Sequence, residues 1–183
     1  TPSSGVSSIG GRAFLEAYRI FQNAYYLDAA RSVADFFLKD LNMDRLDDRR
    51  ACFSYTPLDR FHVHNANRFV ADHLYQVGTL TGETTYIEAA EPAVNYTVGE
   101  QNDDGSWYYW GPPDEILRSV DHYHTGFILR CLDRICAVGA ARPNWETALD
   151  RGFRFYVNNF FLPSGLPKPK PDQAYPVDIH GCA

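Results

Sequence analysis

The sequence contains no long hydrophobic run. A helix that crosses a bilayer needs roughly 20 consecutive apolar residues, and no stretch of the 183 residues approaches that length. The first residues also lack the basic region followed by an apolar one that marks a signal peptide. We therefore expect no membrane partner.

Cysteine is scarce, and its four copies are too few and too scattered for a disulfide framework. Cys131 and Cys136 lie five residues apart on one predicted helix, so they do not share a face. This pattern favours a reducing compartment, and we predict a cytoplasmic protein.

Positive charge is also in short supply. Lysine and arginine number 17 against 23 aspartates and glutamates, which gives a net charge of −6. A protein that binds a phosphate backbone needs a basic stripe, and the sequence has none, so we expect no nucleic-acid partner.

Motifs for metals and common cofactors are missing. His62 with His64, and His122 with His124, have a His-x-His spacing that can chelate a metal, but no Cys-x-x-Cys or His-Glu-x-x-His pattern accompanies them. Gly-rich phosphate loops, a dinucleotide fingerprint and serine-nucleophile patterns are absent too. We expect no metal and no cofactor.

Two sets of residues recur with a period of about 60. The first set is an aromatic residue followed three positions later by alanine, at Tyr26, Tyr86 and Trp145. The second set is a histidine in a constant phase to the first, at His64, His124 and His180. Two independent markers with one period indicate an internal repeat, which decides the fold class.

Each repeat has apolar residues at helical spacing over two segments that a short turn separates. The predicted helices cover about residues 11–22, 27–41, 65–77, 86–100, 125–138 and 145–161. Pro92 should kink the fourth helix or delay its start. We predict one all-α domain over residues 1–183, with helical hairpins at about 5–41, 62–101 and 122–161 and the start of a fourth at 178–183.

Connections between the hairpins are long and turns within them are short, so the long loops gather at one end of the molecule, where function is expected. Three hairpins form an open arc with an unsatisfied apolar edge. We therefore expect either self-association or a longer protein that supplies the missing half.

Hairpins of this size, with long loops on one side, resemble the α/α toroid folds. Five motifs carry a closer resemblance, namely Cys52-Phe-Ser-Tyr-Thr-Pro57, Val63-His-Asn-Ala-Asn67, Gln101-Asn-Asp-Asp-Gly-Ser-Trp-Tyr-Tyr109, Asp121-His-Tyr-His-Thr-Gly-Phe127 and Tyr175-Pro-Val-Asp-Ile-His180. Together they resemble bacterial and archaeal six-hairpin, glycosidase-like proteins, which are often found with surface-polysaccharide machinery. The resemblance implies that the chain is about half of a six-hairpin barrel in a carbohydrate setting.

A second resemblance is shorter. Gln101-x-x-x-Gly105-x-Trp107 is similar to the QW motif of terpenoid-cyclase and prenyltransferase-like toroids, and residues 161–167 form a degenerate counterpart. The Asp-x-Asp-Asp motif of one class of terpene cyclases and a zinc set of the prenyltransferase type are both absent. These absences disfavour an isoprenoid substrate.

The catalytic candidates are His64, His124, His180, Asp121 and Asp178. The three histidines are expected at the N-terminal ends of inner helices, facing the mouth of the toroid. A helix N-terminus disfavours imidazolium, so these rings should stay neutral and able to act as a base or hydrogen-bond partner. The two aspartates can orient the rings, exchange protons, or simply cap the helices.

The predicted substrate-binding residues are aromatic platforms for sugar rings and polar groups for their edges. They are Asn65, Asn67, Asp104, Trp107, Tyr108, Trp110 and Tyr123. Two of them have a strong structural alternative. Asp104 belongs to an Asp-Asp-Gly turn, and for Trp107 we prefer packing between hairpins to a place in the cleft.

The main functional hypothesis is a carbohydrate-active protein that binds or processes an oligosaccharide or polysaccharide in the long-loop cleft. Carboxylate pairs suit glycoside hydrolysis, histidine pairs suit epimerisation, and the same loops support both. Two alternatives remain open: a non-enzymatic helical-repeat scaffold that binds a partner chain, and a cyclase-like toroid with a polyprenyl ligand.

Overall fold

Six helices follow one another in pairs along the chain. The structure is a computed structural model that describes residues 1–183 except 115–117, 141 and 178–183. The helices are α1 (Ser4–Phe21), α2 (Ala24–Lys39), α3 (His64–Thr81), α4 (Thr84–Gly99), α5 (His122–Ile135) and α6 (Pro143–Asn159). A π-helical turn, Cys136–Ala140, extends α5. The all-α class and the three helical hairpins are thereby confirmed; whether residues 178–183 begin a fourth lies outside the described residues.

The aromatic repeat has a structural counterpart. Tyr26, Tyr86 and Trp145 are each the third residue of the second helix of a hairpin, α2, α4 and α6. The two in α4 and α6 are buried, and so are Ala90 and Ala148, one turn further along these helices. The period of about 60 residues therefore marks equivalent positions in three successive hairpins.

Some predicted boundaries were wrong. Helix α1 begins at Ser4 rather than near residue 11, because the Ser3 hydroxyl accepts a hydrogen bond from the Val6 N–H and the Ser4 N–H donates to the Tyr55 carbonyl at 2.9 Å. Pro92 lies inside α4 and does not delay its start. The loop after α2 holds a short antiparallel hairpin, β1 (Met43–Arg45) and β2 (Ala51–Phe53), that was not predicted.

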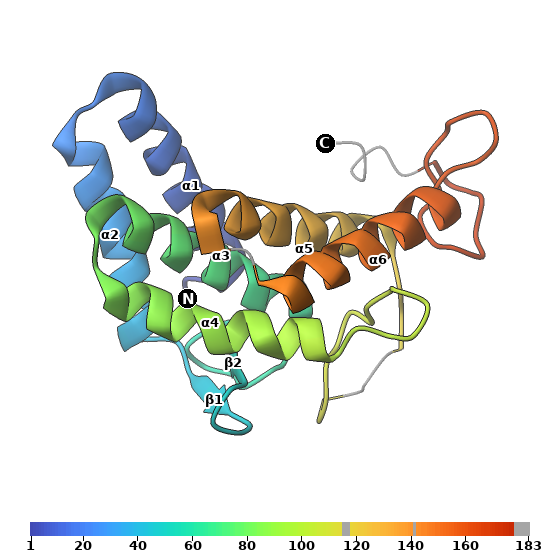
Figure 1. The fold of residues 1–183 in the computed structure, drawn as a ribbon, viewed down its shortest axis with the longest axis horizontal. Helices are drawn as coiled ribbons and strands as arrows, with labels where there is room; N and C mark the ends of the chain where they lie inside the picture. Colours follow the sequence, from blue (N-terminus) through green and yellow to red (C-terminus); the bar gives the residue numbers. More distant parts are fainter. Residues whose placement is uncertain (115–117, 141, 178–183) are drawn as a thin grey trace.

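The first helices of the hairpins form an inner row. Gly5 lies beside Phe69 and Gly11 beside His73, so α1 and α3 run in the same direction. Phe69 contacts Phe127 with 4.8 Å between ring centroids, which joins α3 to α5. Figure 1 shows the hairpins as an arc, with the α1–α2 hairpin at one end and α6 at the other. The N-terminal ends of α3 and α5 therefore lie on the same side of this row of helices. The long loops that precede the two helices lie on that side too.

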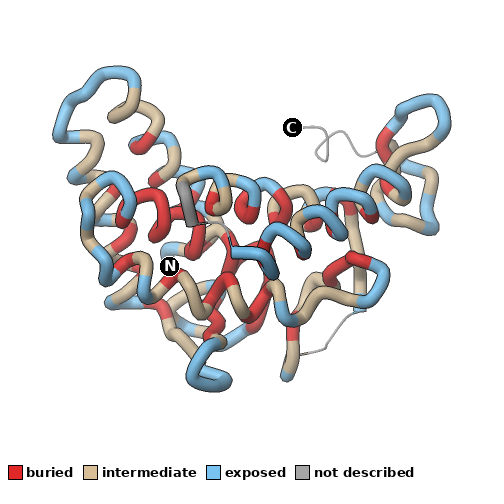
Figure 2. The backbone as a smooth tube through the Cα atoms, in the orientation of Figure 1, coloured by how far each residue is buried: buried red, intermediate tan, exposed pale blue. Residues whose placement is uncertain are grey.

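Helix α3 is the centre of the molecule. It contacts α1, α2, α4 and α5, and the buried segments in Figure 2 gather around it. Its buried face nevertheless carries polar side chains. The Arg68 guanidinium is fully buried without a hydrogen bond to any described residue, and burial lowers its pKa to about 10.

Two histidines of α3 are also buried. His64 is 1% exposed and stacks on Tyr96, with ring centroids 5.3 Å apart. Burial, with the nearby charges of His62 and Arg68, lowers the pKa of His64 to about 3. Burial likewise lowers the pKa of His73 to about 4, although its Nε2 contacts the Ala30 carbonyl at 2.9 Å. Both rings are neutral at pH 7.

Trp107 joins the second hairpin to the third. It is 1% exposed, and its indole N–H donates to the Thr97 carbonyl at 2.7 Å. Its six-membered ring lies on the backbone of Gly152 in α6, where an added Cβ would be 2.5 Å from the ring. This is the packing role that we preferred for Trp107, and it excludes Trp107 from the surface of any cleft.

The Gly152 contact predicts the effect of one methyl group. Gly152→Ala should destabilise the protein by about 1–3 kcal/mol, because the new Cβ would overlap the Trp107 ring and Leu129. The matched control is Gly10→Ala in α1, where nothing lies within 4 Å of the added atom. That variant should gain up to about 1 kcal/mol from helix propensity. Urea unfolding measures both, and equal stabilisation of the two variants would contradict the Trp107 packing.

The buried histidines predict how stability depends on pH. In the unfolded chain each ring takes up a proton near pH 6.5, whereas folded His64 and His73 do so only near pH 3 and pH 4. Since the unfolded state binds more protons, the free energy of unfolding should fall by about 2 kcal/mol per histidine between pH 7 and pH 5.

The variant His64→Phe keeps a ring on Tyr96 but cannot titrate, so its loss over the same pH range should be about half that of the parent. Burial raises the pKa of Asp72, which acts in the opposite direction but equally in both proteins. Urea unfolding at a series of pH values provides the comparison. Parallel curves for parent and variant would show that His64 is not buried in the neutral form.

Candidate functional site

Asp121 and His124 form a dyad at the start of α5. One carboxylate oxygen of Asp121 accepts the His124 backbone N–H at 2.9 Å and so caps the helix. The same carboxylate lies 2.7 and 2.8 Å from Nδ1 of the His124 ring. The Asp-x-x-His spacing produces this geometry, because residues Ncap and N3 of a helix face each other.

The charge on Asp121 determines the tautomer of the His124 ring. Burial would raise the pKa of Asp121, but hydrogen bonds from the side chain and backbone of His124 outweigh burial and hold the pKa below its ordinary value. The carboxylate is therefore ionised at neutral pH, and Nδ1 of His124 carries the proton that points to it. No hydrogen bond to Nε2 is found within the described part of the chain. In this tautomer Nε2 presents a lone pair, which is the arrangement of a general base.

Tyr109 lies against the dyad. Its ring centroid is 4.5 Å from that of His124, at 65°. Burial raises the pKa of Tyr109, and the charges of Tyr55 and Asp121 act in the same direction. The phenol therefore keeps its proton at neutral pH and can donate it. Asp121, His124 and Tyr109 together combine an oriented base with a nearby acid.

The sequence analysis missed Tyr109 and chose Tyr108 and Trp110 beside it. The only signal was the aromatic run itself. Which member meets His124 depends on a backbone bridge between Val63 and Trp110, which pairs the run with the chain just before α3. The Tyr109 carbonyl accepts the backbone N–H of His64 at 3.3 Å in the same pairing.

Aromatic side chains surround the dyad. Tyr123 is 37% exposed and contacts the His124 ring edge-on, with centroids 5.3 Å apart. Trp110 is half-buried between Tyr109 and the exposed Phe61. Flat, partly exposed rings next to polar groups suit the apolar faces of sugars. The predicted residues Trp110 and Tyr123 are thus brought to the dyad, while Tyr108 lies under the Arg118 guanidinium at 5.6 Å.

His64 does not face the mouth of the arc. It begins α3 at the same end as His124, as the repeat predicted, but it is buried beneath Tyr96 and Gly111. An added Cβ at Gly111 would lie 2.8 Å from Nε2 of His64. The equivalent sequence position therefore gives a core residue in one hairpin and a half-exposed one in the next.

The two predicted asparagines differ. Asn67 is fully buried, and its side chain accepts the Phe53 N–H at 3.0 Å and donates to the Ala93 carbonyl at 2.8 Å. It fastens β2 to α4 and has no group left for a substrate. Asn65 is 8% exposed, and its Oδ1 has no hydrogen-bond partner among the described residues.

Asp104 belongs to a turn. Its carboxylate accepts hydrogen bonds from the backbone and hydroxyl of Ser106, at 2.9 and 2.7 Å. Arg151 of α6 donates to the carbonyls of Asn102 and Asp103, which fastens the turn to the third hairpin. The turn interpretation of Asp104 is the one that its contacts support. The remaining candidates, Asp178 and His180, lie outside the described residues.

The other histidines make structural contacts. The ring of His122 lies between the Tyr156 hydroxyl at 2.6 Å and the Lys168 carbonyl at 3.0 Å. His62 contacts the Pro112 carbonyl at 2.6 Å. In the part of the chain that the structure describes, no three His, Cys, Asp or Glu side chains gather as metal ligands would. No described helix is long and apolar enough to cross a membrane.

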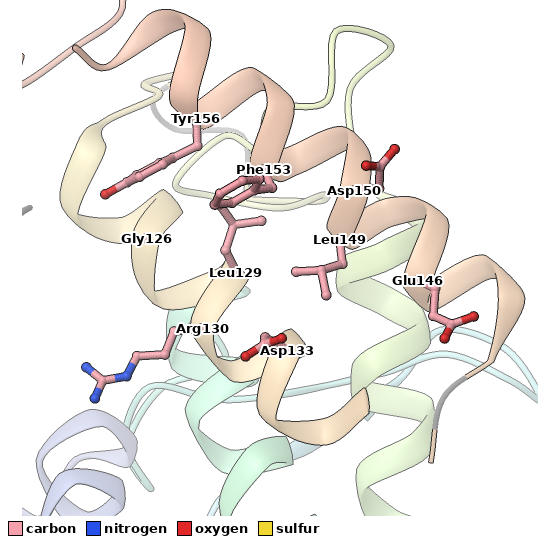
Figure 3. A pocket seen from close by; sticks show the side chains of 9 residues that line it. All are labelled: Gly126, Leu129, Arg130, Asp133, Glu146, Leu149, Asp150, Phe153 and Tyr156. Atoms are coloured by element: carbon pink, nitrogen blue, oxygen red, sulfur yellow. The ribbon is translucent and has the colours of Figure 1, made fainter. Parts of the chain in front are cut away.

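Two hollows flank α5. A groove of about 580 Å³ runs between α5 and α6. Figure 3 shows Leu129, Leu149 and Phe153 in it, with Asp133 and Glu146 nearby. A smaller pocket of about 190 Å³ lies between α1, α3 and α5. The groove is on the open edge of the arc, and the pocket is on its inner row.

No protein-family model and no curated protein matches this sequence. Solved structures do match the fold. A polysaccharide lyase matches 96% of this chain and 55% of its own, with a TM-score of 0.73 and 13% identity. The α-1,6-mannanase of glycoside hydrolase family 76 from Salegentibacter sp. HEL1_6 matches 96% and 53%, with a TM-score of 0.65 and 14% identity.

A family 76 α-mannanase from Bacteroides thetaiotaomicron matches 92% of this chain and 48% of its own, with a TM-score of 0.71 and 14% identity. The chain spans about half the length of each of these three proteins. It therefore has the six-hairpin, glycosidase-like α/α toroid fold, of which it covers about half.

Proposed function

We propose that the chain binds an oligosaccharide at the long-loop end of its inner helices and catalyses proton transfer on it. The observation that carries this proposal is the Asp121–His124 dyad with Tyr109 against it. His124 would act as the base, Tyr109 as the acid, and Asp121 would orient the base. Half-exposed aromatic rings around the dyad supply a surface on which sugar rings can stack.

The structural neighbours support a carbohydrate ligand. Two are α-mannanases and one is a polysaccharide lyase. An inactive variant of the Salegentibacter enzyme, with two aspartates replaced by asparagine, was solved with α-1,6-mannotriose. Because one fold serves different chemistries, the reaction must be argued from the side chains of this chain.

The side chains favour proton abstraction over hydrolysis. Glycoside hydrolysis by the usual route needs two carboxyl groups that flank the bond. Here one carboxylate, Asp121, is committed to a histidine, and Asp104 is committed to a turn away from it. An oriented imidazole with a protonated phenol suits removal of a proton from a carbon next to a carboxyl or carbonyl group.

Two outcomes share that first step. Nε2 of His124 takes the proton, and the C–H electron pair moves toward the neighbouring carboxyl or carbonyl group. In an elimination the glycosidic C–O bond then breaks, a C=C bond forms, and Tyr109 gives its proton to the leaving oxygen. In an epimerisation a proton returns to the same carbon from the opposite face, which needs a donor other than Tyr109, because the Tyr109 ring is in contact with that of His124. Proton transfer of this kind contributes about 10²–10⁴ to the rate.

The roles predict a pattern among variants. His124→Ala and Tyr109→Phe should each lower turnover of a cleaved oligosaccharide by at least about 10²-fold. Asp121→Asn should lower turnover too while retaining the helix cap, since asparagine caps as well as aspartate. Asp104→Asn, which alters an exposed acid in the turn, is the matched control and should be silent.

The assay is a panel of neutral and acidic oligosaccharides followed by mass spectrometry. Elimination leaves the mass sum of the products equal to that of the substrate, and one product absorbs in the ultraviolet. Hydrolysis adds the mass of one water. Water addition, or full activity in His124→Ala, would contradict the proposed chemistry.

We also propose that the open edge of the arc is covered by a second copy of the chain when the chain is isolated. The groove between α5 and α6 has an apolar floor, and Phe153 on α6 is 58% exposed at its edge. Helix α1 at the other end also exposes apolar residues, including Val6 at 74% and Ile9 at 57%. Apolar edges of this extent are typical of surfaces that bind another chain.

The groove predicts an oligomer in solution. Light scattering on the isolated chain should give a mass above 20.8 kDa at micromolar concentration. Phe153→Asp should return the mass to that of one chain, because a charge in an apolar interface is costly to bury. Leu58→Asp, at an 82% exposed loop residue, is the control and should not change the mass. A parent that is monomeric throughout would refute self-association.

A further inference from the structure

The pocket on the inner row is lined by arginines from two helices. Arg12 of α1 and Arg130 and Arg134 of α5 line it, together with Asp72 of α3. Phe69 and Phe127, whose rings are 4.8 Å apart, form an apolar wall of the same pocket. Three arginines and one aspartate thus line a pocket of about 190 Å³.

Of these three arginines, only Arg134 forms an ion pair within the described residues. Nε of Arg134 lies 3.0 Å from the Asp72 carboxylate, and Nη1 lies 3.8 Å from Glu16. Arg12 and Arg130 have no ion pair or hydrogen bond with any residue that the structure describes. Burial and the neighbouring charges of Arg134 and Arg130 lower the pKa of Arg12, and these effects outweigh the opposing attraction of Asp72 and Glu16. The positive charges of Arg12 and Arg130 would attract an anion into this pocket.

A second observation also points to a ligand. Ser8 of α1 lines the same pocket, and its side chain is 4% exposed. Its hydroxyl is buried without a hydrogen-bond partner in the described residues. A buried hydroxyl normally has a partner, and one left without any costs about 1–3 kcal/mol. An anionic oxygen in the pocket would accept from this hydroxyl and from the two arginines together.

The pocket lies further along α5 than the dyad. Arg130 follows His124 by six residues on α5, which is about 9 Å along a helix axis. Between them lies Phe127, whose ring contacts Tyr123 at 4.5 Å. In Figure 3 the Arg130 side chain extends from the side of α5 away from α6, and Arg130 also lines the groove between the two helices. A sugar chain that reaches His124 over Tyr123 and Phe127 would place its next charged group at Arg130.

We propose that this pocket, with Arg12, Arg130 and Ser8, binds the carboxylate or sulfate group of an acidic oligosaccharide. The inference rests on the proposed function for the sugar and narrows its substrate class from oligosaccharides to anionic ones. Guanidinium groups bind both kinds of anion in bidentate geometry. The chain as a whole has a net charge of −6 and would repel an anion. A preference for anionic over neutral oligosaccharides must therefore come from the arginines of this pocket.

Calorimetric titration of the full chain tests the inference with four probes: trigalacturonate, sulfated maltotriose, maltotriose and sodium sulfate. At least one acidic trisaccharide should bind about tenfold or more tightly than maltotriose at physiological ionic strength. Arg12→Gln and Arg130→Gln should each weaken that binding by about tenfold, since a hydrogen bond to a charged group is lost. The two acidic probes distinguish a carboxylate from a sulfate ligand.

Arg154→Gln is the matched control. It removes the same charge from α6, where the Arg154 side chain is 74% exposed and pairs with Asp150, and it should leave binding unchanged. Thermal unfolding checks that the variants fold. Neither Arg12→Gln nor Arg130→Gln should lower the midpoint, because each replaces an arginine that has no partner among the described residues.

Each alternative outcome is informative. Equal binding of acidic and neutral trisaccharides, or an acid preference that survives the double variant Arg12→Gln/Arg130→Gln, would overturn the anion pocket while leaving the oligosaccharide site intact. Sulfate ion binding that the double variant abolishes, without binding of any sugar, would support the pocket and reject the proposed function. No binding of sulfate or of either acidic sugar would overturn the pocket.

Discussion

The position of one loop determines the rest of the site. Gln101 donates to carbonyls of its own turn and of α6, and Trp107 fills the space between the second and third hairpins. The chain that follows can then pair with the residues before α3, through the bridge of Val63 to Trp110. That pairing places Tyr109 against His124. Packing between hairpins therefore brings an imidazole of one helix against a phenol from a loop that belongs to another hairpin, the two groups that the proposed function uses as base and acid.

Charge is distributed unevenly over the inner row of helices. His64, Arg68 and His73 lie on the buried face of α3, where the imidazoles stay neutral and the guanidinium has no hydrogen-bond partner among the described residues. Burial of this kind destabilises the fold, and natural chains usually retain such groups for a reason other than stability. The arginines of α1 and α5 lie on the neighbouring face, where a ligand can reach them. Stability and polarity thus conflict along the inner row, as is expected at a functional site.

The sequence predicted what depends on periodicity and local spacing. The aromatic markers at Tyr26, Tyr86 and Trp145 located three equivalent helices, and the Asp-x-x-His pattern of Asp121 and His124 located the dyad. These features are set by residues within one helix turn or by a repeat in the chain, so a single sequence contains them. The role of Trp107 was also predictable, since a tryptophan between two hairpins must bury its large apolar surface.

What the sequence could not predict depends on contacts between distant segments. His64 and His124 occupy equivalent repeat positions, yet only one is buried, because Gly111 and Tyr96 cover His64 alone. Asn67 was predicted to bind a sugar, but its side-chain amide is taken up by hydrogen bonds to β2 and α4. Arg12 and Arg130 are 118 residues apart in sequence, and nothing local indicates that they share a pocket.

The overall fold and the side chains at the helix starts also contribute differently to the chemistry. Related folds serve a polysaccharide lyase and α-mannanases, so the arc of hairpins fixes where a sugar chain can lie but not what happens to it. The reaction depends on which side chains stand at the helix starts. A carboxylate that is free there can protonate or attack a glycosidic bond, whereas Asp121 is held by His124 and, in the proposed reaction, acts through it. On the proposed function, an acid–imidazole pair in place of a free acid would favour proton abstraction over hydrolysis in a cleft of the same fold.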